Sequence, residues 1–215
     1  MRHYKDKDAI LNVLTKDGLV PILGRGIFDQ KKPLRIFTSP FIKANYEIYK
    51  GKVGGFKLKD GKILKFYNEN YLDFNLLSTL DFISELTLKT IDGIDDFRAL
   101  YNLVDSTLNK VVEHFDKLIL VEYFLNILKL LGLKILIENF EDQIFMPTKG
   151  TFIFDDDING VYFSVDEVIL INNILNNKND EYSLATVDAD KILESLNKFL
   201  VSFTDVRLKS ISLLI

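Results

Sequence analysis

Residues 10–23 read ILNVLTKDGLVPIL, the pattern of two short strands joined by a tight turn. The apolar runs 10–15 and 19–23 lie on either side of Lys16, Asp17 and Gly18. A hairpin at this point commits the N-terminal part of the chain to antiparallel β-structure.

Alternation of side chains predicts further strands up to residue 67. Residues 44–49 alternate with the period of a half-buried strand. Residues 56–59, FKLK, predict a strand with one apolar and one lysine-lined face, and Asp60-Gly61 predicts a turn into a strand at 62–67. About five short strands in this space predict a small antiparallel β-barrel, such as an OB-fold.

From residue 71 the apolar period becomes that of helices. Ser164 and Glu167 have the spacing of a capping box, and Gly132 ends the most apolar helix. Residues 151–154 and 161–163 predict one β-hairpin. The fold class is therefore α+β, with a mainly α-helical second domain. Helices are predicted at about 76–92, 97–115, 118–131, 164–175 and 188–203.

Charge divides the chain at the same place. Residues 1–70 hold 15 Lys and Arg against 7 acids, whereas residues 71–215 hold 12 against 24, which gives the net charge of -4. A general bias toward lysine would spread it evenly. We therefore expect a basic OB-fold domain at 1–70 and an acidic helical domain at 71–215. The basic domain is the natural partner of a polyanion, because Lys and Arg contacts to phosphate release counterions.

The loop after residue 23 is the most suggestive segment for phosphate binding. Gly24 and Gly26 allow close backbone approach, and the cations that follow suit a phosphate chain. Asp29 replaces the third glycine of a dinucleotide fingerprint, and no Walker loop is present. The alternative interpretation is a solvated loop. The predicted nucleic-acid-binding residues are Arg25, Lys31, Lys32, Arg35, Lys43, Lys57 and Lys59.

The sequence offers little for catalysis or metal binding. Without cysteine there is no disulfide, thiol nucleophile or zinc–thiolate site. Residues 155–160 imitate the start of a calcium loop, but Asp166 stands where a bidentate Glu is usual. His3 and His114 are isolated. We therefore expect no enzyme, no cofactor and no required metal.

Membrane and export signals are also missing from the sequence. The apolar stretch 118–133 is interrupted by polar residues and is shorter than the roughly 20 residues of a membrane span. The charged start, MRHYKDKD, is unlike a signal peptide. These features predict a cytoplasmic protein without membrane contact.

Taken in order, these features resemble the RecO family of bacterial recombination mediators, which act in DNA repair. The resemblance covers nearly the whole chain, although each motif alone is weak. It rests on YKDKD at 4–8, ILNVLTKDG at 10–18, LGRG at 23–26, the basic loop, the Ser39-Pro40-Phe41 step into the strand at 46–49, LLGL at 130–133 and VRLKS at 206–210.

The resemblance implies an OB-fold followed by a helical domain, without catalysis. Such a protein binds single- and double-stranded DNA, anneals complementary strands and, with RecR, helps load RecA on SSB-coated single strands. The acidic, Phe-ended C-terminal tail of SSB needs cations on the helical domain, and the candidates are Lys129, Lys134, Arg207 and Lys209. The alternative is an OB-type RNA-binding or translation-associated module with a helical protein-interaction domain.

Two departures from the family matter. Many members carry a four-cysteine zinc finger, but the corresponding residues, about 138–163, contain no cysteine. The remnant of that region is expected to be held together by side-chain packing alone, without zinc. The family also begins with another strand before the 4–8 motif, so the barrel is expected to lack most of its first strand.

Reversing Lys31 and Lys32 to Glu is expected to weaken DNA binding for all sequences and to flatten its salt dependence, because fewer counterions are released. Titration of labelled DNA at several salt concentrations measures both effects. Unchanged affinity at moderate salt would remove this loop from the interface.

Overall fold

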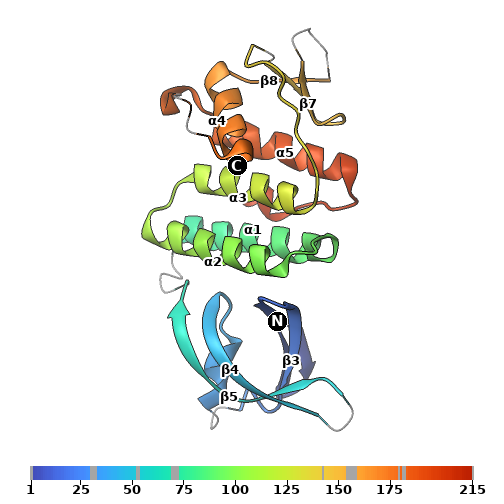
Figure 1. Cartoon of the computed structure of the whole chain (residues 1–215). Coiled ribbons are helices and arrows are strands. Elements are labelled where there is room, and N and C mark those ends of the chain that lie inside the picture. Colours follow the sequence, from blue (N-terminus) through green and yellow to red (C-terminus); the bar gives the residue numbers. More distant parts are fainter. Residues whose placement is uncertain are drawn as a thin grey trace. The chain divides into compact units, whose positions relative to one another are not determined.

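The computed structural model describes residues 2–29, 33–51, 54–68, 73–141, 143–153, 159–178, 180 and 183–214. The chain divides into two units, Met1–Leu77 and Ser78–Ile215. The first is built on a five-stranded sheet and the second is mainly helical (Figure 1). The predicted α+β class is confirmed.

The sheet of the first unit has the order β1-β2-β3-β5-β4. β3 and β5 pair in parallel, whereas the sequence predicted only antiparallel strands. Among the described residues β1 and β4 do not pair, so the sheet is not closed into a barrel. The strands are β1 (Arg2–Lys5), β2 (Asp8–Thr15), β3 (Gly18–Gly24), β4 (Ile42–Lys50) and β5 (Phe56–Phe66), and a 3-10 helix, η1 (Pro33–Thr38), precedes β4.

The predicted first hairpin is confirmed as β2–β3. Thr15 pairs with Gly18, which leaves Lys16 and Asp17 as the turn. Gly18 has a φ of 123°, which L-residues rarely adopt. The Thr15 hydroxyl donates to the Gly18 carbonyl at 2.9 Å and closes the turn.

The predicted turn at Asp60-Gly61 is wrong. β5 runs without interruption through both residues and forms a hairpin with β4 instead. Gly61 is required by packing, because a Cβ there would lie 2.8 Å from Cζ of Phe37 and 2.6 Å from the carbonyl oxygen of Asn45. Phe37 thus fixes η1 against the middle of the β4–β5 ribbon.

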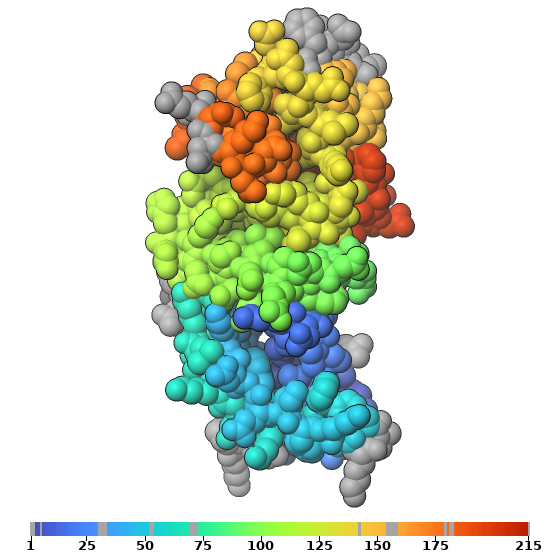
Figure 2. Space-filling view, in the orientation of Figure 1, coloured from blue at the N-terminus to red at the C-terminus, as the bar shows by residue number. Residues whose placement is uncertain are grey.

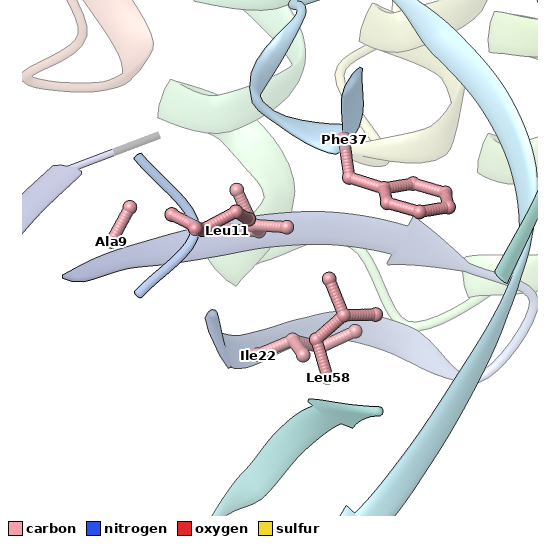
Figure 3. Packing of buried hydrophobic residues seen from close by; sticks show 6 residues of the cluster. Ala9, Leu11, Ile22, Phe37 and Leu58 are labelled. Atoms are coloured by element: carbon pink, nitrogen blue, oxygen red, sulfur yellow. The ribbon is translucent and has the colours of Figure 1, made fainter. Parts of the chain in front are cut away.

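One small hydrophobic core lies inside this unit. Its side chains come from β2, β3, β5, η1 and the turn after β3, and five of them converge in Figure 3. Each buried Leu, Ile or Phe side chain of this core stabilises the fold by roughly 1.5–3 kcal/mol relative to exposure. The fully enclosed members are Ala9, Leu11, Ile22, Ile27, Phe37 and Leu58.

The five predicted helices of the second unit are confirmed. Aspartate side chains cap four of them, and α3 is buried among α2, α4 and α5. Gly132, with a φ of 73°, follows the end of α3 as predicted. The helices are α1 (Phe74–Thr90), α2 (Phe97–Glu113), α3 (Lys117–Leu130), α4 (Val165–Asn176) and α5 (Ala189–Phe203), with 3-10 turns η2 (Ile91–Gly93), η3 (Leu184–Thr186) and η4 (Ser210–Leu213).

The predicted capping box at the start of α4 is also confirmed. The Ser164 hydroxyl accepts from the Glu167 backbone N–H, and the Glu167 carboxylate accepts from the Ser164 N–H. The same buried carboxylate receives the Lys191 ammonium at 2.6 Å, which joins α4 to α5.

The region expected to be a zinc-finger remnant forms a three-stranded sheet of β6 (Ile144–Met146), β7 (Thr151–Ile153) and β8 (Val161–Tyr162). The prediction that β7 and β8 pair with each other is wrong, since both pair with β6. β6 is buried along its length, because the Phe145 ring packs against those of Phe152, Phe163 and Phe199. Residues 155–157 of the calcium-like motif lie outside the described residues.

Glu85 on α1 holds the segment that leads into η4. Its carboxylate accepts hydrogen bonds from the Lys209 N–H and from both the N–H and hydroxyl of Ser210, and it pairs with Lys89 at 2.7 Å. Burial raises the pKa of Glu85, but Lys89, Ser210 and Lys209 outweigh it and lower this pKa from 4.5 to about 2.

Because that pKa is lowered by folding, Glu85 stabilises the protein above pH 4.5, and this contribution is lost as pH falls from 4.5 toward 2. Glu85→Gln should therefore lower the free energy of unfolding at pH 7 by on the order of 2 kcal/mol and reduce the acid dependence. Urea unfolding followed by circular dichroism at pH 7, 4.5 and 3 measures both effects. Glu122→Gln is the control, because Glu122 pairs with Lys110 at an exposed site. If the free energy of unfolding falls equally with pH in wild type and in Glu85→Gln, Glu85 is not the source of the acid dependence.

Candidate nucleic-acid interface

The β4–β5 ribbon has two unlike faces because side chains alternate along each strand. Ala44 and Tyr46 on β4, with Leu58 and Ile63 on β5, face the core. Burial raises the pKa of Tyr46, which keeps it neutral. The opposite face, here called the outer face, carries Lys43, Asn45, Glu47 and Tyr49 from β4 and Lys57, Lys59, Asp60, Lys62 and Lys65 from β5.

The outer face is arranged as cross-strand rows. Tyr49 lies opposite Lys57, whose ammonium is 5.9 Å from the tyrosine ring centre. Lys59 makes an exposed ion pair with Glu47 at 3.4 Å, which contributes little to stability. The face thus holds five lysines against two acids, with an aromatic ring at one end.

Two like charges meet at the other end of the ribbon. Lys43 on β4 lies directly opposite Lys65 on β5, and the Lys65 ammonium lies 5.1 Å from the ring centre of Tyr67. Directly opposed like charges destabilise a sheet. This end of the outer face is therefore positively charged. Figure 2 shows β4 and β5, coloured light blue to cyan, along one side of the sheet unit.

The turn after β3 brings Arg25 to the same end as Lys57. Leu23 pairs with Lys57, and Arg25 follows two residues later with an exposed side chain. The glycines here serve folding. Gly24 gives Ile27 room to pack, and the Gly26 N–H donates to the Asp8 carboxylate at 2.7 Å. That N–H is therefore committed within the fold, contrary to the phosphate role expected from the sequence.

The predicted residues thus divide into three groups. Lys43, Lys57 and Lys59 lie on the outer face, and Arg25 lies beside its Lys57 end. Arg35 is exposed on η1, two residues before the buried Phe37. Lys31 and Lys32 lie outside the described residues.

Sequence reasoning missed Lys62 and Lys65. Both were placed on a separate strand after the supposed turn at Asp60-Gly61. With β5 continuous, they extend the lysine row started by Lys57 and Lys59. Strict alternation does not identify them, because the register shifts at residues 59 and 64 break the period of two on both sides of that glycine.

β2 and β3 also have a side that faces away from the core, and its residues differ from those of the outer face of β4 and β5. On β2 and β3 the side chains opposite the core include Ile10, Leu14, Leu19 and Leu23, and neither strand contains Lys or Arg. Cations are therefore concentrated on the β4–β5 outer face.

The cations predicted to bind a partner lie on the helical unit. Arg207 and Lys209 are exposed beside the last turn of α1, where Lys89 donates to the Arg207 carbonyl. Lys129 is exposed in the last turn of α3, and Lys134 is exposed just beyond it. α3 ends near η2, because a Cβ on Gly93 would lie 3.0 Å from the Leu131 side chain. The ends of α1 and α3 therefore lie at one end of the bundle.

Within the described residues, no group of three or more His, Asp or Glu is placed to hold a metal ion. No helix among them combines the length and apolar character needed to cross a membrane. No protein-family model matches the sequence, and no curated protein matches it significantly.

Replacing both Lys57 and Lys59 with Glu should weaken DNA binding at least about tenfold and reduce the slope of log affinity against log salt by about two, because two phosphate contacts are lost. Fluorescence anisotropy with a labelled oligonucleotide measures both. Lys178→Glu with Lys198→Glu is the control, since it changes the net charge equally at exposed sites on the helical unit. If both double variants lose affinity equally, the outer face is not the interface.

Proposed function

We propose that this chain is a non-catalytic DNA-binding protein of the RecO type, whose sheet unit binds single- and double-stranded DNA. The observation that carries the proposal is the β4–β5 outer face, with five lysines, two acids and Tyr49. A positively charged track with an aromatic side chain is typical of proteins that bind nucleic acid without sequence preference.

The strand arrangement supports an OB-fold for this unit. The sheet is a five-stranded Greek key in which β3 pairs in parallel with β5 and a short helix precedes β4. Partly open barrels of this kind bind oligonucleotides. The usual OB-fold site lies on strands 2 and 3, but here those strands carry no cation. The proposal therefore assigns DNA to β4 and β5.

The helical unit is proposed to contact proteins. Following the resemblance, its partners are RecR and the acidic SSB tail, with cytoplasmic RecA loading as the outcome. The cations near the ends of α1 and α3 support a site for an acidic peptide. Lys110 and Lys117 are less suited to it, because Glu122 and Asp190 hold their ammonium groups at 2.7 and 2.6 Å, closer than the exposed 3.4 Å pair of Lys59 with Glu47. The proposed contacts are Lys129, Lys134, Arg207 and Lys209.

The purified protein is expected to anneal complementary strands coated with SSB, and Lys57→Glu with Lys59→Glu should slow annealing. Parallel titrations of single-stranded DNA, duplex DNA and structured RNA at two salt concentrations identify the ligand. The Lys178/Lys198 double variant serves again as control. Tighter binding to RNA than to either DNA, without annealing, would overturn the proposal in favour of an RNA-binding module.

A further inference from the structure

Tyr49 carries an exposed aromatic ring on the outer face of the β4–β5 ribbon. The residue is 48% exposed, whereas Leu58 and Ile63 on the opposite side of the ribbon pack in the core. Tyr67, whose ring also lies near a lysine of β5, is 3% exposed, so its ring is closed to a ligand. Tyr49 therefore offers a ligand a half-exposed ring beside the row of lysines.

Lys57 is held next to this ring. It lies opposite Tyr49 in the register of the two strands, and its ammonium is 5.9 Å from the ring centre. This distance is near the outer limit of a cation–π contact, so the pair is weak and a ligand can replace it. Gly51 permits the placement, because a Cβ there would lie 2.8 Å from Cε and 3.1 Å from Nζ of Lys57. The lysine chain thus crosses the backbone at Gly51 and sets its charge beside the ring.

We propose that Tyr49 stacks on an unpaired base while Lys57 contacts the neighbouring phosphate, which makes single-stranded DNA the preferred ligand of the outer face. The inference rests on the proposed DNA binding by that face. An aromatic side chain can stack on any of the four bases, because every base has a π-face, and cations beside it follow the backbone.

A duplex cannot use Tyr49 in this way. Its bases are already paired and stacked on one another, and pulling one out of the stack costs free energy. The lysines of the outer face contact phosphates in either form of DNA, since that interaction is independent of base pairing. Tyr49 therefore adds affinity for single strands, and the lysines add affinity for both forms.

Removal of the ring tests the stacking. In Tyr49→Ala the affinity for a labelled oligothymidylate should fall at least about fivefold, because base–aromatic stacking is lost. The salt dependence should stay unchanged, since no phosphate contact is removed. Affinity for a duplex should also stay unchanged, and Tyr49→Phe should bind like the wild type. Tyr162→Ala is the matched control, because Tyr162 is a 63% exposed tyrosine of the helical unit.

An abasic strand with the same number of phosphates separates stacking from a structural role of Tyr49. Wild type and Tyr49→Ala should bind this strand equally, because it has no base to stack. Fluorescence anisotropy measures each affinity, and circular dichroism confirms that each variant is folded. Equal losses of Tyr49→Ala on the normal, abasic and duplex ligands would overturn the proposal.

Lys57→Ala distinguishes a failure of stacking from a failure of the proposed function. It should weaken binding of both DNA forms and reduce the salt slope for the single strand by about 0.7, the value of one phosphate contact. If Lys57→Ala has this effect and Tyr49→Ala has none, the outer face binds DNA without stacking and the inference is wrong. If neither variant changes binding, the outer face is not the interface, and the proposed function falls with the inference.

Fluorescence gives a readout that does not depend on affinity. The chain contains no tryptophan, so Tyr49→Trp places a single indole at this position. A stacked base quenches indole fluorescence, so saturating oligothymidylate should quench this variant and a saturating duplex should not. Tyr162→Trp should be quenched by neither. Unchanged fluorescence of Tyr49→Trp on a single strand that anisotropy shows to be bound would refute the stacking.

Discussion

The small core of the sheet unit fixes which side chains of β4 and β5 face outward, and the proposed DNA-binding face depends on it. Leu58 on β5 faces the core, so its neighbours Lys57 and Lys59 point outward, and Tyr46 on β4 faces the core in the same way. Phe37 secures this arrangement by packing on Gly61, where no larger residue fits. This packing contact therefore helps to hold the register of the lysine rows.

Local signals account for what the sequence predicted well. The start of α4 was found through the capping box of Ser164 and Glu167, and the first hairpin through Gly18, because each signal acts within a few residues. The errors came from contacts distant in sequence. Gly61 looked like a turn because its real partner, Phe37, is 24 positions away. That error hid Lys62 and Lys65, and so about half of the lysine row. The pairing of β6 with both neighbours depended equally on ring contacts among distant phenylalanines.

The cysteine-free region around β6 shows how packing organises a segment for which the family resemblance implies a metal. Phe145 sits among three other rings, with centroid separations of 5.0 to 6.0 Å. Edge-on and tilted contacts of this kind add about 0.5–1.5 kcal/mol each beyond burial. Lys191 caps the cluster over the Phe163 ring while pairing with Glu167. Aromatic contacts and one buried ion pair thus join this small sheet to α4 and α5.

The Glu85 contacts also have a consequence for folding during synthesis. Partners in the β2–β3 hairpin are at most 15 positions apart, so this part of the sheet can form soon after the ribosome releases it. Glu85 is 124 positions from Lys209. The Glu85 carboxylate on α1 therefore lacks its contacts with Lys209 and Ser210 until translation has passed residue 210. Completion of the helical unit is then a late event that follows the sheet by most of the elongation time.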